Sequence, residues 1–339
     1  LAYIVYRLDG RPEAAVSSEL WARRSDIWDT PVLVEGDFEV SGKPIATSNG
    51  EMVHVVYNIL DGGHLAIKYV RLNDFLQAGV VESSLTTDFN LIDASTGSDG
   101  SLFVIYKSGS DLKYADNFGD SGDMTNHLVL DSSMNEKPDI YVNGNPETVY
   151  VIYSKAHPGT SDELLITSCP ASACSTPTTV AMPLDADLHW SIRGDSQIIA
   201  DSDENAYYVF TATNDDNLDV NGFVGDYIVG ETGGSIDIPY QGTNTPENEA
   251  DPRMCLFWDM IPAGTWRIDL GGGYYGNLYE FDLLGGFRKL RDTTTSPGTY
   301  DTACTNEWFG TIWNEENASV RQAWVSFNAY ASMMPVIIK

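Results

Sequence analysis

Short apolar runs rich in β-branched and aromatic residues recur at nearly even intervals along the chain. The five clearest are Tyr3–Tyr6, Val53–Tyr57, Leu102–Tyr106, Val149–Tyr153 and Tyr207–Phe210. Their closing aromatic residues stand at positions 6, 57, 106, 153 and 210, which gives steps of 51, 49, 47 and 57 residues. A period near 50 made of strand-type runs is typical of a β-propeller, in which each repeat forms one four-stranded sheet.

Turn signals and further strand-type runs surround these core runs. Asn49-Gly50, Asp99-Gly100 and Asn143-Gly144 precede three of them, and such pairs between apolar runs are strong hairpin signals. A second apolar run follows each core run, as in Leu65–Tyr69, and a more variable one closes the repeat, as in His127–Leu130. Each repeat therefore predicts four antiparallel strands in a row.

Two less regular repeats follow in the last third of the chain, with first strands predicted at Arg253–Phe257 and Asp301–Cys304. We therefore predict an all-β chain that forms a single propeller domain over residues 1–339. Seven four-stranded blades fit the repeats best, and six or eight are the alternatives. The predicted blades span residues 1–42, 43–89, 90–135, 136–188, 189–250, 251–299 and 300–339.

The first and last repeats differ from the others at their ends. Leu1 enters directly on the core strand, so the first repeat lacks its first strand. The C-terminal run Pro335–Ile338 either fills this gap, which would remove an open sheet edge, or forms the outer strand of the last repeat. Because the chain begins with neither Met nor a signal peptide, we expect that residues upstream of Leu1 were removed or left out.

Composition narrows the range of partners. The chain has 49 acidic and 19 basic residues, which gives a net charge of −30. Nucleic acids and anionic membrane surfaces are recognised through clusters of Lys and Arg, so we expect neither as a partner. No run of 18 apolar residues occurs, and we expect no membrane insertion. The acidic surface either keeps the protein soluble or attracts a divalent cation or a cationic partner.

The four cysteines favour an oxidising compartment. Cys169 and Cys174 enclose four residues, a spacing that fits a small disulfide-closed loop. Cys255 and Cys304 stand at similar offsets in neighbouring repeats, which fits a second disulfide, with two buried free thiols as the alternative. Together with the acidity, these pairs predict an extracellular or cell-surface protein.

Two passages resemble the sialidase-like propeller superfamily, whose repeats run roughly Leu-Tyr-x-x-Ser, a loop, and then Trp-x-x-Pro-x-x-Val. Leu20–Ser25 is followed by Trp28–Val34, and Leu165–Ser168 is followed by Cys174–Val180. The resemblance implies the fold rather than the activity. Sialidases also carry Asp-box turns, three arginines for the substrate carboxylate and a Tyr nucleophile with a Glu partner, and none of these can be assigned to this sequence.

One acidic stretch resembles a calcium-binding loop. Asn217, Asp219 and Asn221 alternate before Gly222, and Asp226 follows one residue later than the spacing of such loops requires. Oxygen ligands at alternate positions before a glycine suit Ca²⁺. The stretch therefore predicts either a Ca²⁺ site or a solvated acidic hairpin.

Charged residues at the entry of the predicted inner strands are candidates for the mouth of the central channel, where propellers usually bind ligands. These residues are Lys43, Asp93, Lys137, Arg193, Asp195, Asp251, Arg253 and Asp301. Mixed charges can supply acid–base chemistry or neutralise a substrate, and they can equally form ion pairs and turn caps. Lys43, Lys137 and Arg253 are the candidate ligand-binding cations.

One histidine lies in a setting suited to sugar chemistry. His189 is followed by Trp190, and Arg193 and Asp195 come shortly after. A tryptophan face, a base and a cation together suit a sugar substrate. We therefore take His189, Arg193 and Asp195 as candidate catalytic residues and Trp190 as a candidate ligand-binding residue. His54 lies inside a core strand and is predicted to pack in the core.

These patterns predict a secreted or cell-surface propeller that acts as a binding or structural interaction module, with an extracellular glycan or protein as its partner. A polysaccharide lyase or glycosidase with its site at the channel mouth is the first alternative, since a propeller lyase needs only a Tyr or His base and a charge-neutralising group. A self-assembling extracellular structural protein is the second, because an open sheet edge can bind another copy.

Overall fold

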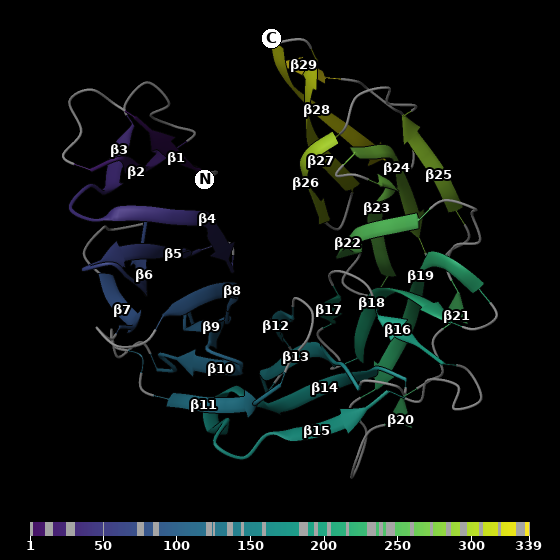
Figure 1. The fold of residues 1–339 in the computed structure, drawn as a ribbon, viewed down its shortest axis with the longest axis horizontal. Helices are drawn as coiled ribbons and strands as arrows, with labels where there is room; N and C mark the ends of the chain where they lie inside the picture. The colour runs from purple at the N-terminus through teal and green to yellow at the C-terminus, as the bar shows by residue number, and fades with distance from the viewer. Residues whose placement is uncertain are drawn as a thin grey trace. The chain divides into compact units, whose positions relative to one another are not determined.

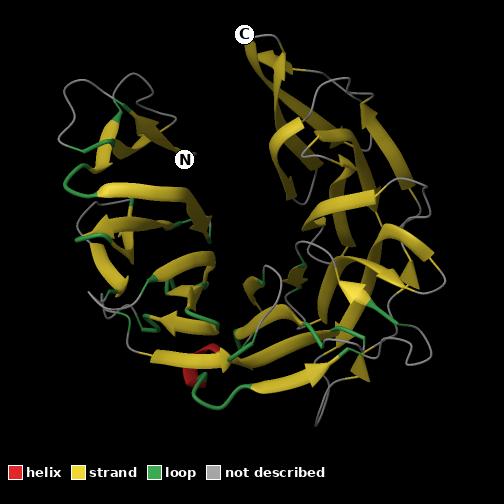
Figure 2. Cartoon of the chain, in the orientation of Figure 1, coloured by secondary structure: helices red, strands yellow, loops and turns green. Residues whose placement is uncertain are grey.

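A computed structural model gives the fold. It describes residues 3–10, 16–24, 31–49, 51–72, 78–83, 88–119, 124, 126–133, 138–143, 146–157, 161–182, 189–192, 196–201, 205–214, 217–228, 235–236, 240–241, 248–257, 261–271, 274–282, 286–291, 297–304, 308–317, 320–329 and 336–338. Within these ranges the elements are β-strands, apart from one short 3-10 turn at Ala171–Ala173 (Figure 2). No helix in this part of the chain is long and apolar enough to span a membrane.

Seven antiparallel sheets follow one another in the described ranges, and each is built from a contiguous stretch of chain (Figure 1). The first three are formed by β1 (Tyr3–Asp9), β2 (Ser18–Arg24) and β3 (Val32–Glu35); by β4 (Glu39–Ser48), β5 (Val53–Asp61), β6 (His64–Arg71) and β7 (Ala78–Glu82); and by β8 (Phe89–Thr96), β9 (Leu102–Ser108), β10 (Asp111–Asp116) and β11 (Asn126–Asp131).

The next two sheets are formed by β12 (Asp139–Asn143), β13 (Thr148–Lys155), β14 (Glu163–Pro170) and β15 (Thr178–Ala181); and by β16 (Ser191–Ile192), β17 (Gln197–Ala200), β18 (Asn205–Asn214), β19 (Asn217–Ile228), β20 (Ser235–Ile236) and β21 (Tyr240–Gln241). In the second of these, β16 and β17 both pair with β18, and β20 and β21 both pair with β19. That sheet therefore keeps the four-strand plan with an interrupted first strand and an interrupted outer strand.

The last two sheets are formed by β22 (Asn248–Phe257), β23 (Ile261–Gly271), β24 (Tyr274–Asp282) and β25 (Gly286–Arg291); and by β26 (Pro297–Cys304), β27 (Trp308–Asn317), β28 (Val320–Ala329) and β29 (Val336–Ile338). The chain divides into two compact units, residues 1–134 with 170–176 and residues 135–169 with 177–339. The predicted all-β propeller class is confirmed. Three points stay predictions: that seven blades close into a ring, that residues 1–339 form a single domain, and that the blades have the boundaries given above.

Alternate residues of the core strands pack against different neighbouring sheets. In β5, Val55, Tyr57 and Ile59 belong to a cluster with Leu20 of β2, whereas Val56 belongs to a cluster with residues of the third sheet. Successive side chains of a strand point to opposite faces, so a strand with sheets on both sides is apolar at nearly every position. This is why the core runs read as continuous rather than alternating patterns.

The predicted Asp99-Gly100 hairpin connects β8 to β9. Gly100 has a φ of +86°, a conformation that glycine adopts without steric cost. The side-chain amide of Asn49 donates to the Gly97 carbonyl oxygen over 2.9 Å, and His54 Nε2 lies 2.9 Å from the Gly100 carbonyl oxygen. His54 is fully buried, which confirms its predicted place in the core.

The C-terminal strand belongs to the last sheet. Val336, Ile337 and Ile338 in β29 pair with Val325, Trp324 and Ala323 of β28. Of the two predicted alternatives, the outer strand of the last repeat is therefore confirmed, and completion of the first sheet by this segment is wrong. In the first sheet the strand order is β1-β2-β3, with β1 at one edge.

Candidate functional site

A buried carboxylate ends the outer strand of the first sheet and contacts the second sheet. Glu35 Oε2 accepts hydrogen bonds from the Tyr57 hydroxyl over 3.3 Å and from Lys68 Nζ over 3.1 Å. Its Oε1 accepts from the backbone N–H groups of Asp37 and Phe38, over 2.9 and 3.2 Å. The Glu35 carboxylate therefore joins the two sheets through one tyrosine and one lysine.

The register of the second sheet places Lys68 for this contact. Lys68 on β6 is paired with Tyr57 on β5, and its Nζ lies 4.0 Å from the centre of the Phe38 ring. Burial alone would raise the pKa of the Glu35 carboxyl, but the hydrogen bonds from Asp37 and Lys68 outweigh it and hold the pKa below its usual value. The carboxylate thus stays charged and is neutralised by a lysine ammonium.

The same arrangement recurs between the second and third sheets, with one change. Glu82 ends β7, and its Oε2 accepts a hydrogen bond from the Tyr106 hydroxyl of β9 over 3.1 Å. His127 Nδ1, from β11, lies 3.2 Å from the same hydroxyl and 3.5 Å from Glu82 Oε2. Tyr106 is fully buried, while the side chains of Glu82 and His127 are 24% and 38% exposed. This cluster therefore reaches the surface, with a carboxylate and an imidazole at its open side.

Both tyrosines are poor bases in this setting. Burial raises the pKa of Tyr57 and of Tyr106 well above the usual value of 10, and the neighbouring Glu35 and Glu82 charges raise them further. A phenol that abstracts a proton needs a lowered pKa. Chemically, these groups hold neighbouring sheets together rather than act as general bases.

The raised phenol pKa values predict a loss of stability in alkali. Above pH 10 the phenols of Tyr57 and Tyr106 ionise in the unfolded chain but stay protonated in the folded one, so stability falls as pH rises. Each phenol contributes a slope of about 1.4 kcal/mol per pH unit. Urea unfolding of the wild type and of the double variant Tyr57→Phe/Tyr106→Phe, between about pH 9 and pH 11, should show the shallower slope in the variant. Equal slopes would contradict the assignment.

The candidate channel-mouth residues fall on several elements. Lys43 is exposed on β4, and Asp93 is half-buried where the pairing of β8 with β9 shifts register. Arg253 on β22 is half-buried, and its Nη1 donates to the Pro252 carbonyl oxygen over 2.9 Å. Asp251 on β22 and Asp301 on β26 are described at the backbone only. Lys137, Arg193 and Asp195 lie outside the described residues.

Trp190, the candidate ligand-binding residue, lies in the core. Trp190 is only 5% exposed and packs in the cluster that joins the fourth and fifth sheets, with its ring centre 6.5 Å from that of Phe210. Its backbone N–H donates to Ser161 Oγ, and its carbonyl oxygen accepts from the Asp162 N–H. The prediction of Trp190 as a ligand-binding face is therefore wrong, because its apolar area is buried between sheets. His189 beside it is exposed.

The acidic stretch proposed for calcium lies on a strand. Asn217, Asp219, Asn221 and Asp226 all belong to β19, whose residues pair with β18 from Asn217 to Ile228. A strand rises about 3.3 Å per residue, so the backbone of this stretch is extended rather than turned back on itself. The Ca²⁺ site stays a prediction. In the part of the chain whose side chains are described, no group of three or more His, Cys, Asp and Glu residues is placed to hold a metal ion.

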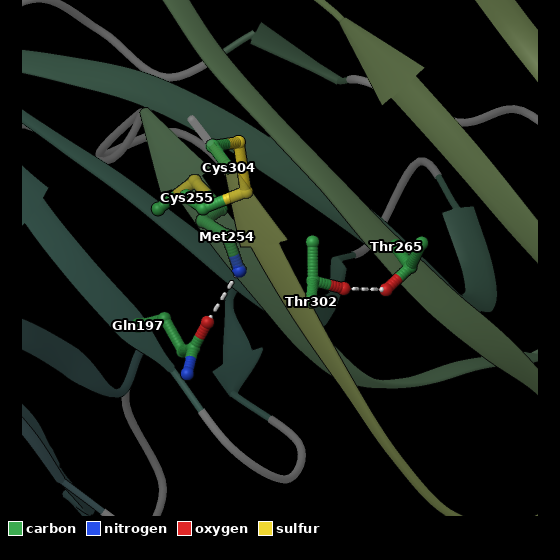
Figure 3. Close-up of a disulfide and its surroundings, with 6 residues drawn as sticks. All are labelled: Gln197, Met254, Cys255, Thr265, Thr302 and Cys304. Atoms are coloured by element: carbon green, nitrogen blue, oxygen red, sulfur yellow. Dashed lines mark hydrogen bonds between the residues drawn. A yellow bond between two sulfur atoms is a disulfide. The ribbon is translucent and has the colours of Figure 1, made fainter. Parts of the chain in front are cut away.

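All four cysteines are disulfide-bonded. Cys255 of β22 is bonded to Cys304 of β26, with 5.5 Å between their Cα atoms, so Cys169 and Cys174 form the other pair. Figure 3 shows further links near the first bond: the Met254 N–H donates to Gln197 Oε1 of β17 over 2.6 Å, and the hydroxyls of Thr265 and Thr302 are hydrogen-bonded. The first strand of the sixth sheet, β22, is thus linked to β17 of the fifth sheet and to β26 of the seventh.

The sequence prediction missed the two carboxylate clusters. A usable signal was present: Glu35 and Glu82 precede Tyr57 and Tyr106 by 22 and 24 residues, and each ends the outer strand of its sheet. Of each pair, the tyrosine marks the repeat period, and the acid stands at a nearly constant distance before it. An acid that recurs in phase with a core tyrosine indicates a contact between neighbouring sheets.

The successive antiparallel sheets, most of them four-stranded, define a β-propeller fold. No family model matches the chain, and no curated protein matches it. Solved structures do match. One is a protein of unknown function from Dyadobacter fermentans, with a TM-score of 0.57, 6% identity, and coverage of 86% of this chain and 94% of that one.

Two further solved structures extend the comparison. The sialidase of Trypanosoma rangeli, in complex with sialic acid, has a TM-score of 0.50 and 9% identity, over 97% of this chain and 59% of that one. A puromycin-hydrolysing peptidase of Mycobacterium tuberculosis has a TM-score of 0.55 and 11% identity, over 98% of this chain and 51% of that one. At such identities these likenesses establish the fold alone.

Proposed function

We propose that this protein is an extracellular β-propeller that binds a glycan and acts as an interaction module. The fold supports this proposal, because a sialidase solved with sialic acid shares it. The two disulfides support the extracellular location, since such bonds persist in oxidising compartments.

The observation that favours binding over catalysis is the state of the buried tyrosines. Tyr57 and Tyr106 are 3% and 0% exposed, and each is hydrogen-bonded to a carboxylate that raises its pKa. A lyase of the propeller type would need an accessible Tyr or His with a pKa suited to proton abstraction. The hydroxyls of Tyr57 and Tyr106 instead bond to carboxylates of the neighbouring sheet.

The charge of the chain favours a neutral glycan. A net charge of −30 repels polyanions at long range, so an anionic polysaccharide would bind only against that repulsion. We propose that Lys43, exposed on the first strand β4, orients the ligand by hydrogen bonds to its hydroxyls.

The test is a binding screen with activity readouts on the same samples. The purified chain is applied to arrays of neutral and anionic glycans, and thermal shift, reducing ends and unsaturated uronates are measured with and without EDTA. We expect a neutral glycan to bind without product, with affinity reduced about tenfold or more by Lys43→Ala, as for loss of one charged hydrogen bond. Lys113→Ala, whose Nζ lies over the Phe89 ring, is the control and should bind normally. Product from any glycan, or no binding to any, would overturn the proposal.

A further inference from the structure

The two carboxylate clusters occupy equivalent positions in successive repeats, and they differ in what neutralises the acid. Lys68 and Lys113 are paired in register with Tyr57 and Tyr106 on the neighbouring strand. In the first cluster the Lys68 ammonium lies 3.1 Å from Glu35 Oε2. In the second, the Lys113 ammonium lies 5.8 Å from the centre of the Phe89 ring; Glu82 Oε2 contacts Tyr106 and His127, and Glu82 Oε1 accepts from the Ser83 N–H over 3.2 Å. A position that holds a cation in one repeat is therefore lined by neutral and anionic donors in the next.

These donors form a compact triangle. Glu82 Oε2, the Tyr106 hydroxyl oxygen and His127 Nδ1 are separated by 3.1, 3.2 and 3.5 Å. Ligand atoms around a four-coordinate metal ion with bonds of about 2.0–2.2 Å lie about 3.3–3.6 Å apart. The three atoms come from β7, β9 and β11, so pairing in the third sheet and packing on the second fix them. Since Glu82 and His127 are partly exposed, a fourth position is open to water.

We propose that Glu82, Tyr106 and His127 form a binding site for a divalent transition-metal ion of the zinc type, and that the hydroxyl proton of Tyr106 is released to solvent when the ion binds. An imidazole nitrogen with two oxygen donors suits Zn²⁺ or Cu²⁺, whereas Ca²⁺ takes six or more oxygen ligands and Mg²⁺ an octahedron of oxygens. The ion supplies at Glu82 the positive charge that Lys68 supplies at Glu35. It also ties the outer strand of the second sheet to two strands of the third.

The site is tested by titrating the full chain, stripped with EDTA, with Zn²⁺ against a chromophoric competing chelator. We expect binding of one ion, lowered about tenfold or more by His127→Ala and by Tyr106→Phe, the range seen when a supporting or ligating group is lost. His64→Ala and His157→Ala are matched controls, because both histidines are partly exposed and lie beside a carboxylate, that of Asp88 at 3.3 Å and that of Glu163 at 3.0 Å. Both controls should bind Zn²⁺ as the wild type does.

A second readout separates the site from loss of folding. Co²⁺ replaces Zn²⁺ as a probe, and its visible absorption is strong in four-coordinate and weak in six-coordinate geometry. We expect the strong form in the wild type and its loss in His127→Ala, with both proteins melting at the same temperature in EDTA, since His127 is exposed. No Zn²⁺ binding, an equal loss in the His64→Ala control, or unchanged affinity in Tyr106→Phe would each overturn the proposal.

Discussion

Replacing both Cys255 and Cys304 by alanine is expected to lower the free energy of unfolding by about 4 kcal/mol, because the bond closes a long loop. The two residues are separated by 49 positions and join β22 to β26. A crosslink of this length removes a large part of the conformational freedom of the unfolded chain. Urea unfolding without reductant measures the loss, and the difference between the wild type and the variant should disappear in reductant.

The other disulfide is the control for this prediction. Cys169 and Cys174 are five positions apart, and a loop of that size predicts a loss of only about 2 kcal/mol for the double alanine variant. Both variants remove two sulfur atoms and introduce two alanines, so the difference between them isolates loop length. Equal losses in the two variants would show that local packing, not chain entropy, sets the contribution.

Replacing Glu35 by alanine is expected to cost about 3 kcal/mol, because it leaves a buried hydroxyl, an ammonium and two backbone N–H groups without their acceptor. Glu35 is 7% exposed. Asp88→Ala is the matched control: Asp88 contacts His64 over 3.3 Å, and both side chains are exposed. An exposed pair of that kind contributes about 0–1 kcal/mol.

The pH dependence of this loss has a definite sign. The folded pKa of Glu35 is lower than its usual value of 4.5, so its contribution is fully present above that pH and disappears as pH falls through the folded pKa. The difference in stability between the wild type and Glu35→Ala should therefore shrink below about pH 4. A difference that grows in acid would mean that Glu35 is neutral in the folded protein.

A rescue variant distinguishes the missing charge from the missing volume. If the cost of Glu35→Ala comes from the uncompensated Lys68, replacing Lys68 by methionine in the same chain should recover part of the loss. The charge is then removed, and an unbranched apolar side chain stands where the Lys68 Nζ lay over the Phe38 ring. No recovery would place the cost in the Tyr57 hydroxyl and the two backbone donors. Either result identifies which partner of the Glu35 carboxylate accounts for the lost free energy of unfolding.

Strand positions were well predicted, since they depend on local patterns. The core runs at Val53–Tyr57 and Leu102–Tyr106 became β5 and β9, and the hairpin at Asp99-Gly100 connects β8 to β9. These features follow from β-branched and aromatic preference and from turn chemistry, which act over a few residues. The interrupted first strand of the fifth sheet was not predicted, because its two short pieces carry no signal of which strand they pair with.

Site residues were less predictable, because burial is decided by neighbouring sheets. Trp190 reads in the sequence as an exposed aromatic beside a histidine and is in fact covered in the core cluster. Glu35 has no local sequence signal for burial, yet it is only 7% exposed and bonded to two residues of the second sheet. A local pattern cannot tell which face of a residue the next sheet will cover.

The sequence by itself determined the repeat, the order of strands within each sheet and the hairpins that join them, because these depend on contacts between residues close along the chain. Tertiary structure decided that Val336–Ile338 of β29 pair with β28, that Cys255 is bonded to Cys304, and that Glu82, Tyr106 and His127 lie in contact. Each of these is a contact between strands whose register or burial is fixed only when whole sheets pair and pack together.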